Sequence, residues 1–395
     1  MQKQQFNHYA PAILAGLITC FIGISVSAIL VIQAAQGLGA NAEQISSWLW
    51  ALGMGIGLSG LFLTWKLKYP VITAWSTGGL ALIIASTGQY TLYEAIGAFL
   101  VSGIIIALLG FLGIFQRIFH YIPQSLTSAM LAGILLKFGI GVFSSLEHSW
   151  AFVLSVLLIY LVTKQFSARF SIMTTAITAI LICPFFMDFQ IPTVAFSLAT
   201  PVWMAPEFSF SALFGLVLPL VVINLASQYL PGLAIIKSYN YPPQVNTILG
   251  WTGLSQSLFA PFGCMSVNLA AISAAISLDP QAHPDASKRY VAGLSCAFFY
   301  ILMGLLATTM TSILMAFPNI LIAVLAGIAL FGTIGHNITL AFQDIEYREA
   351  ALLTFLFSAS NVQLFGIGSA FWGLVLGVFV FYTTQWYKKR FQSSN

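Results

Sequence analysis

The basic residues of this chain lie in alternate gaps between its apolar stretches, and this pattern constrains the fold more than any other feature. Thirteen of the 14 Lys and Arg residues follow it. About fourteen apolar stretches alternate with these gaps, at 11–33, 45–64, 71–88, 92–112, 124–142, 150–166, 171–186, 211–230, 246–260, 264–278, 290–312, 319–337, 349–366 and 367–386. The basic residues on the side of the N-terminus are Lys3, Lys66, Lys68, Arg117, Lys164, Arg169, Lys237, Lys288, Arg289, Arg348, Lys388, Lys389 and Arg390. Because Lys and Arg favour the cytoplasmic side, we predict an all-α polytopic membrane protein with both termini in the cytoplasm.

The composition supports the lipid bilayer as the main solvent of this chain. Hydrophobic residues make up 59% of the sequence and charged residues only 6%, which excludes a soluble domain with a largely polar surface. The net charge of +4 lies at helix ends beside lipid headgroups, so it indicates no nucleic-acid partner. The 4 cysteines are dispersed without a C-x-x-C motif, and we predict no metal site and no cofactor.

Three weak internal matches recur in the same order and at nearly one offset. Residues 32–35 match 223–226 at 191 residues, Pro70 matches Pro261 at 191, and residues 131–134 match 325–328 at 194. The halves are therefore about 1–200 and 205–395, with seven spans each. An odd number of spans makes the second copy enter from the opposite face, so we predict inverted repeats.

In inverted-repeat carriers the substrate lies near the bilayer midplane, at interrupted spans that correspond in the two halves. Spans three and ten, within 69–82 and 261–272, each read as an extended entry followed by a half-helix. Ser76, Thr77 and Asn268 are residue types that cap helix N-termini. Two facing N-termini would hold an anion through the helix dipoles and free N–H groups. The alternative is that the small residues here only permit close helix packing.

Spans one and eight carry the other unusual polar side chains. Gln33 and Gln36 lie one turn apart, and Asn224, Ser227 and Gln228 have the i, i+3, i+4 spacing of one helical face. Such amides either line a substrate cavity or bond to neighbouring helices. Their matched places in the two halves favour a shared cavity.

Acidic residues are missing from the apolar stretches. All 10 lie in gaps or at span ends, so no intramembrane carboxylate is available as a proton relay or cation ligand. A small anion therefore suits the cavity better than a cation. Lys137 lies well inside span five, where it either snorkels to the outer interface or compensates charge. His336 is interpreted as a helix-end residue and not as the proton carrier.

Five sequence runs together resemble the benzoate–proton symporter family, the BenE-type benzoate transporters. They are QAAQGLGA (33–40), SWLWALG (47–53), TAWST (73–77), ASQYLPG (226–232) and NLAAI (268–272). The resemblance implies a fold similar to uracil permease-like and sulfate permease-like carriers, with seven plus seven inverted spans. It implies a core of spans 1–4 and 8–11 (about 11–112 and 211–312) and a gate of spans 5–7 and 12–14 (about 124–186 and 319–386). It also implies a multi-pass protein of the bacterial inner membrane, proton coupling and a homodimer.

The sequence departs from that family's pattern at three positions near the predicted site. Gly78 stands where Pro is usual, Tyr229 where Asn is usual, and Met265 where His often precedes the NLAA run by three residues. The histidine would be the obvious titratable group near the substrate. Proton coupling is therefore implied by the resemblance and not by these residues.

We predict a secondary carrier for an aromatic carboxylate, benzoate first, that works by relative movement of core and gate. The N-termini at 76–78 and 266–268 would hold the carboxylate, with amides as donors and an indole beside the ring. The predicted substrate-binding residues are Gln33, Trp75, Ser76, Thr77, Gly78, Asn224, Gln228, Met265, Ser266, Val267 and Asn268. A nucleobase or other small-anion carrier is the alternative, and an anion channel is a weaker one. An enzyme is disfavoured because H-E-x-x-H, G-x-S-x-G and paired intramembrane carboxylates are missing.

Overall fold

The computed structural model describes residues 2–25, 27–115, 123–167, 170–187, 196–270 and 273–391. Within these residues the regular secondary structure is helical apart from one pair of two-residue strands and an isolated bridge between Leu364 and Ile367, and loops join the elements. Each of the predicted apolar stretches coincides with one helix or with a short series of elements.

The first half contains seven apolar stretches, and the third of them is broken. Its elements are α1 (Gln2–Ser25), α2 (Ser27–Gly37), α3 (Ala42–Leu67), β1 (Thr73–Ala74), α4 (Thr77–Ala85), α5 (Leu92–Phe111), α7 (Gln124–Ser144), α8 (Leu146–Phe166) and α9 (Ser171–Phe186).

The second half also contains seven apolar stretches, and its third is likewise broken. Its helices and strand are α10 (Phe210–Ala212), α11 (Leu218–Asn224), α12 (Leu230–Ser238), α13 (Val245–Phe259), β2 (Asn268–Leu269), α14 (Ala274–Leu278), α15 (Tyr290–Leu305), α16 (Ala307–Met315), α17 (Asn319–Phe342), α18 (Arg348–Ala359) and α19 (Ser369–Phe391). Two π-helical turns, Leu213–Val217 and Leu225–Tyr229, join α10, α11 and α12 into one continuous helical span.

Seven helices of the described residues are long and apolar enough to cross a membrane alone, and an eighth counts if 286–305 and 307–315, bent by 68°, form one span. The seven are Tyr9–Gly37, Ala42–Leu67, Leu92–Phe111, Gln124–Ser144, Leu146–Phe166, Phe210–Ser238 and Asn319–Phe342. The predicted total of fourteen is therefore not reached by length and composition. Two of the remaining stretches end in the short helices α4 and α14, which cannot span a bilayer by themselves.

Side chains in the sequence explain where two of the spanning helices begin. Asn41 caps α3, and Thr91 caps α5; each exchanges reciprocal side-chain to backbone bonds with the residue three positions on, Gln44 and Glu94. These capping boxes satisfy N–H groups that the helix leaves unpaired. The helix boundaries here follow directly from local sequence.

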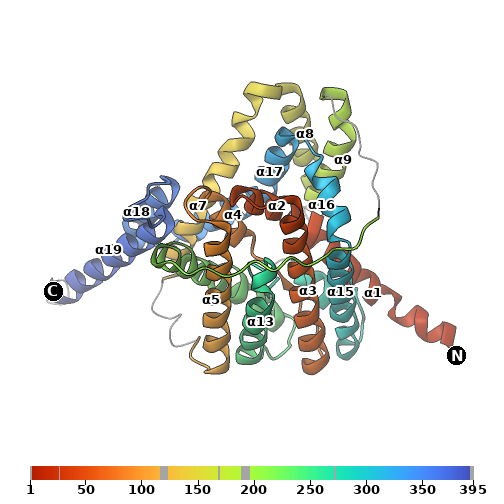
Figure 1. Ribbon diagram of the computed structural model, residues 1–395. Coiled ribbons are helices and arrows are strands. Elements are labelled where there is room, and N and C mark those ends of the chain that lie inside the picture. The colour runs from red at the N-terminus through yellow and green to blue at the C-terminus, as the bar shows by residue number, and fades with distance from the viewer. Residues whose placement is uncertain are drawn as a thin grey trace.

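The helices pack into two groups (Figure 1). In the first, α3 packs on α15 and α5 packs on α13, and Figure 1 shows these four side by side. Their close approach depends on glycine pairs: a Cβ added at Gly53 would lie 2.5 Å from Gly304 Cα, and one at Gly110 would lie 2.2 Å from Gly250 N. In the second group, α7 packs on α17 and α18, α18 packs on α19, and α8 packs on α9.

The two broken stretches meet inside the first group. Strand β1 pairs antiparallel with β2, with Thr73 opposite Leu269 and Ala74 opposite Asn268. The Ala270 N–H extends the pairing by donating to the Ile72 carbonyl at 2.8 Å. Helices α2 and α11 pack on α4, and α4 in turn contacts α7 of the second group. The chain therefore brings a half-helix end to the boundary between the groups.

Candidate substrate site

The break between β1 and α4 forms the helix N-terminus that the sequence predicts. Ser76 is the N-cap in an extended conformation, and its hydroxyl accepts a bond from the Gly79 N–H at 3.0 Å. The Thr77 and Gly78 N–H groups lie in the first turn, where no intrahelical acceptor exists. Ser76 is wholly buried, so these donors and the positive end of the helix dipole lie in a low-dielectric interior.

The second break differs from the prediction. Helix α14 begins at Ala274, and Asn268 lies in strand β2, so residues 266–268 are not a helix N-terminus. The predicted capping role of Asn268 is wrong, because pairing with β1 holds this segment extended through Ala270. Ala271 and Ile272, predicted as part of the half-helix, lie outside the described residues. Ser266 instead accepts a bond from the Ser76 N–H at 3.0 Å and so ties the two segments together.

Three of the predicted amide residues present buried polar atoms without partners. Both amide atoms of Asn224 and of Asn268, and the Gln33 Oε1, have no hydrogen-bond partner in the described part of the chain. Asn224 and Asn268 are wholly buried. An unpaired buried polar group costs about 1–3 kcal/mol, so these groups call for a ligand or ordered water. The alternative for the span-eight amide Asn224, a bond to a neighbouring helix, has no support in these contacts.

Two polar residues that the sequence analysis did not assign hold the second segment in place. The Tyr229 hydroxyl lies 2.6 Å from Thr252 Oγ1 and donates to the Val267 carbonyl at 2.9 Å. The Gln256 amide donates to Phe99 O and Ser102 Oγ and accepts from the Val267 N–H at 3.4 Å. Both side chains are wholly buried. A polar residue within an apolar helix was the available signal, but its partners depend on the tertiary fold.

These bonds decide what Val267 can do. Both of its backbone polar groups are used inside the protein, so Val267 offers neither to a substrate. Met265 is also buried, and its sulfur accepts from the Ser266 hydroxyl at 2.8 Å. Trp75 is buried and packs edge to face against Tyr300, with ring centroids 5.9 Å apart.

The span that carries Asn224 is not regular. Residues Leu225–Tyr229 form a π-helical turn directly after Asn224. The α-helical spacing that placed Asn224, Ser227 and Gln228 on one face is therefore wrong here, because a π turn holds more residues per turn. Ser227 donates back to Ile223 O at 2.7 Å, and Gln228 is half-buried. Such π turns occur frequently at functional sites.

The first turn of α4 is covered by the second helix group. A Cβ at Gly78 would lie 2.8 Å from Leu131 Cδ1 of α7 and 2.9 Å from Ile223 Cγ2 of α11. A Cβ at Gly79 would lie 2.8 Å from the Met265 methyl. A side chain at either glycine would therefore require the ends of these neighbouring side chains to shift.

A cavity of about 380 Å³ lies between helices of the two groups, further along α7 than the contact of Leu131 with Gly78. Helices α2, α4, α7 and α17 line it. Its polar lining comes from Gln33, Gln36 and Lys137, and the other lining residues are Ile84, Phe138, Gly141, Ala323 and Ala326. Of the predicted site residues, Gln33 alone lines it.

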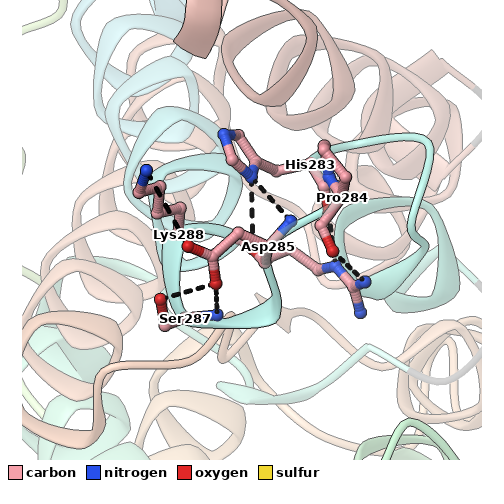
Figure 2. A network of polar contacts seen from close by, with 6 residues as sticks. His283, Pro284, Asp285, Ser287 and Lys288 are labelled. Carbon is pink, nitrogen blue, oxygen red and sulfur yellow. Dashed lines mark hydrogen bonds and ion pairs between the residues drawn. The ribbon is translucent and has the colours of Figure 1, made fainter.

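The loop that follows α14 is held by the buried Arg289. The Arg289 guanidinium donates to the carbonyls of Leu278, His283 and Pro284 at 3.0, 2.7 and 3.3 Å. Figure 2 shows Asp285 bonded to Ser287 and paired with Lys288 at 3.8 Å. The bonds from the Ser287 hydroxyl and N–H hold the pKa of Asp285 below its usual value. Arg289 thus anchors the last carbonyl of α14, the helix end where a cation is favourable.

Comparison with known proteins places this arrangement. Residues 6–382 match the family described as "BenE: Benzoate membrane transport protein". The chain belongs to this family. It is 42% identical over 372 residues to the "Inner membrane protein YdcO" of Escherichia coli (strain K12), covering 94% of this chain and 95% of that protein. It is 36% identical over 372 residues to the "Benzoate membrane transport protein" of Acinetobacter baylyi, covering 94% of each. The predicted family and the prediction of a membrane transporter, not an enzyme, are confirmed.

Solved structures share the fold at low sequence identity. The "overall structure of SLC26A9" superposes with a TM-score of 0.66 at 16% identity, over 96% of this chain and 65% of that one. The murine Slc26a9 anion transporter, described as inward-facing, gives 0.63 at 16% identity, over 96% and 68%. The transmembrane domain of the cyanobacterial bicarbonate transporter BicA gives 0.56 at 15% identity, over 95% and 96%. These neighbours show a transporter fold for the chain.

Proposed function

We propose that this protein is a secondary carrier that takes up benzoate across the bacterial inner membrane by alternating access. The observation that carries the proposal is the set of unpartnered buried amides on Asn224 and Asn268, in segments packed around the N-terminus of α4. Amide N–H donors and free backbone N–H groups suit a carboxylate, and the wholly buried setting strengthens each bond.

The site we infer is asymmetric. The carboxylate is held by the Thr77 and Gly78 N–H groups at the end that Ser76 caps, with Asn224 and Asn268 as side-chain partners. Gln228 is a further side-chain partner of the carboxylate, and the π turn sets the direction of its side chain. We infer that the indole of Trp75 packs beside the aromatic ring of the substrate. Met265 and Ser266 shape the opposite wall, and Val267 supports it from behind.

Helix contacts support an inverted repeat and a division into core and gate. If span n of the first half corresponds to span n+7, the α5–α13 contact (spans four and nine) becomes α15–α3 (spans eleven and two), and both exist. Likewise α18–α19 corresponds to α8–α9, while α7–α17 and β1–β2 each correspond to themselves. All these contacts stay within 11–112 and 211–312, the proposed core, or within 124–186 and 319–386, the proposed gate. We further propose cytoplasmic termini, from the charge pattern, and a homodimer, from the family resemblance.

Proton coupling would follow from the family resemblance. Met265 replaces the family's histidine, and no intramembrane acid stands beside the substrate. If a proton moves with benzoate, it travels on the substrate carboxylate or on water.

Uptake into proteoliposomes tests the proposal. Labelled benzoate should accumulate and saturate, and unlabelled benzoate inside should accelerate its entry by counterflow, which a channel cannot do. Uracil serves as the competing nucleobase probe, and sulfate serves as the competing inorganic anion. No benzoate uptake, with saturable uptake of another probe, would make the alternative substrate correct.

Asn268→Ala should weaken benzoate binding, whereas Asn337→Ala is the matched control. Asn337 is also buried on a helix, but its amide donates to Thr333 O at 2.8 Å. Equal binding by both variants would remove the support that the unpartnered amides give.

A further inference from the structure

We propose that Lys137, with Gln33 and Gln36, forms a second carboxylate-binding site at the outer mouth of the carrier, which holds the substrate before it reaches α4. This inference rests on the proposed function for the identity of the substrate. The existence of the site is argued from the cavity, its charge and its position.

The cavity lies toward one end of all four helices that line it. Gln36 precedes the last residue of α2, Ile84 lies in the last turn of α4, and Lys137 begins the last two turns of α7. Ala323 and Ala326 lie in the first two turns of α17. In the alternating order of the spans these ends all face away from the Lys- and Arg-rich gaps. By the positive-inside bias this is the outer side.

The charge of the cavity favours an anion. Lys137 forms no ion pair and no hydrogen bond with any of the described residues, and the cavity lining contains no acidic side chain. The nearby aromatic partner is its neighbour Phe138, with the ammonium 5.4 Å from the ring centroid. Gln33 and Gln36 add amide donors, and the Gln33 Oε1 is buried without a partner. A cation and amide donors without a carboxylate bind an anion best.

The shape of the cavity narrows the ligand to a small aromatic or other apolar monocarboxylate. Its volume of about 380 Å³ falls within the range of small-molecule sites, roughly 300–1,000 Å³. Phe138 and Ile84 provide apolar walls beside the polar groups. A strongly hydrated inorganic anion gains nothing from such walls.

The position of the cavity places it before the α4 site on the path from outside. Lys137 follows Leu131 by six residues on α7, so it lies about 9 Å further along the helix axis. Leu131 is the residue that covers Gly78. A substrate held by Lys137 therefore waits on the outer side of the contact that must open.

Thiol labelling tests the charge of the cavity without any transport. Gly141 lines the cavity, and a Cβ at this position would meet nothing within 4 Å, so Gly141→Cys fits the fold. The four native cysteines are buried, which keeps the background low. A negatively charged methanethiosulfonate should react with the introduced thiol about tenfold faster than a positively charged one, with that preference lost in Lys137→Gln. Benzoate should slow the negative reagent.

Transport kinetics test the role of the site. Lys137→Gln should raise the KM for benzoate entering from outside about tenfold, the loss of one contact to a charge, with little change in maximal rate. Lys137→Arg should retain most of the affinity. Lys164→Gln is the matched control, because Lys164 lies over Tyr160 at the same 5.4 Å but does not line this cavity.

The outcomes separate this inference from the proposed function. If wild type does not transport benzoate but the thiol prefers the negative reagent, the site stands and its substrate is wrong. If wild type transports benzoate while Lys137→Gln equals Lys164→Gln and the thiol shows no charge preference, Lys137 only snorkels to the interface and the inference fails. Should Lys137→Gln not fold, Lys137→Arg and the labelling preference in the otherwise native protein still decide.

Discussion

The two broken segments occupy corresponding places in the halves but are built differently. In the first, strand β1 turns into α4 within three residues, and the Ser76 hydroxyl caps the helix. In the second, the extended chain continues past Asn268, α14 is only 5 residues long, and its N-cap Ser273 makes no side-chain bond. The halves thus contribute different chemistry: the first a helix N-terminus, the second side-chain amide and hydroxyl groups.

The difference also appears in what holds each segment. Helix α4 is held by its own cap and by packing against α2, α7 and α11. Helix α14 is held from its far end by Arg289, and the extended segment before it is held at Val267 by Tyr229 and Gln256. We infer that the first segment recognises charge and that the second is braced to keep its amide in position.

The largest effect should come from removing the brace on the second segment. Arg289→Gln leaves three carbonyls, two of them in buried bonds, without their charged donor, so the free energy of unfolding should fall by about 3 kcal/mol. Thermal unfolding in detergent measures this. Lys288→Gln, which removes only an exposed ion pair, should leave the midpoint nearly unchanged. A drop of the same size in both variants would mean that Arg289 is no special anchor.

Asn268→Ala should come next, and it acts on binding. Loss of one hydrogen bond to a charged ligand is worth about 1.5–3 kcal/mol, which weakens benzoate binding roughly ten- to a hundredfold. Calorimetric titration of the purified variant measures the change. The unfolding midpoint should stay close to wild type, because the amide bonds to none of the described residues. A destabilised variant with normal affinity would favour the helix-packing role.

The two N-caps offer a direct comparison of smaller size. Ser76→Ala removes a cap that bonds the Gly79 N–H and should cost about 1 kcal/mol of stability. Ser273→Ala removes a hydroxyl with no capping bond and should cost almost nothing. The difference between the two unfolding midpoints is the measurement. Equal midpoints would contradict the asymmetry described here.

The smallest effect concerns His336. Uptake driven by an imposed pH gradient should be the same in His336→Gln as in wild type, because this side chain is exposed near the end of α17, away from the substrate. Labelled benzoate uptake with and without the gradient checks this. Selective loss of the gradient response, with binding intact, would make His336 the coupling residue.

The sequence predicted the fold well where the apolar pattern was long and unbroken. Each apolar stretch coincides with described elements, and the breaks at 71–88 and 264–278 are where they were expected. The start of α14 was not predictable, because Asn268, Leu269 and Ala270 have no strong local preference and their pairing with β1 decides the conformation. The π turns were hidden for a similar reason, since apolar residues fit either helix type.

The site was predictable for polar side chains that are energetically unfavourable within a membrane. Gln33, Asn224 and Asn268 stood out as polar residues in apolar stretches, and the structure leaves polar atoms of each without partners. Tyr229 and Gln256 have the same signal, but their roles depend on bonds to residues far away in the sequence. The sequence thus identified the polar side chains, whereas the structure was needed to tell those available to a substrate from those that bond to the second broken segment.

The bond from the Ser76 N–H to Ser266 and the pairing of Thr73 with Leu269 join the two broken segments inside one body. Any movement between that body and α7 therefore leaves the two halves of the site in contact with each other. If the proposed core moves past the proposed gate, a bound molecule travels with both broken segments together and is not passed from one half to the other.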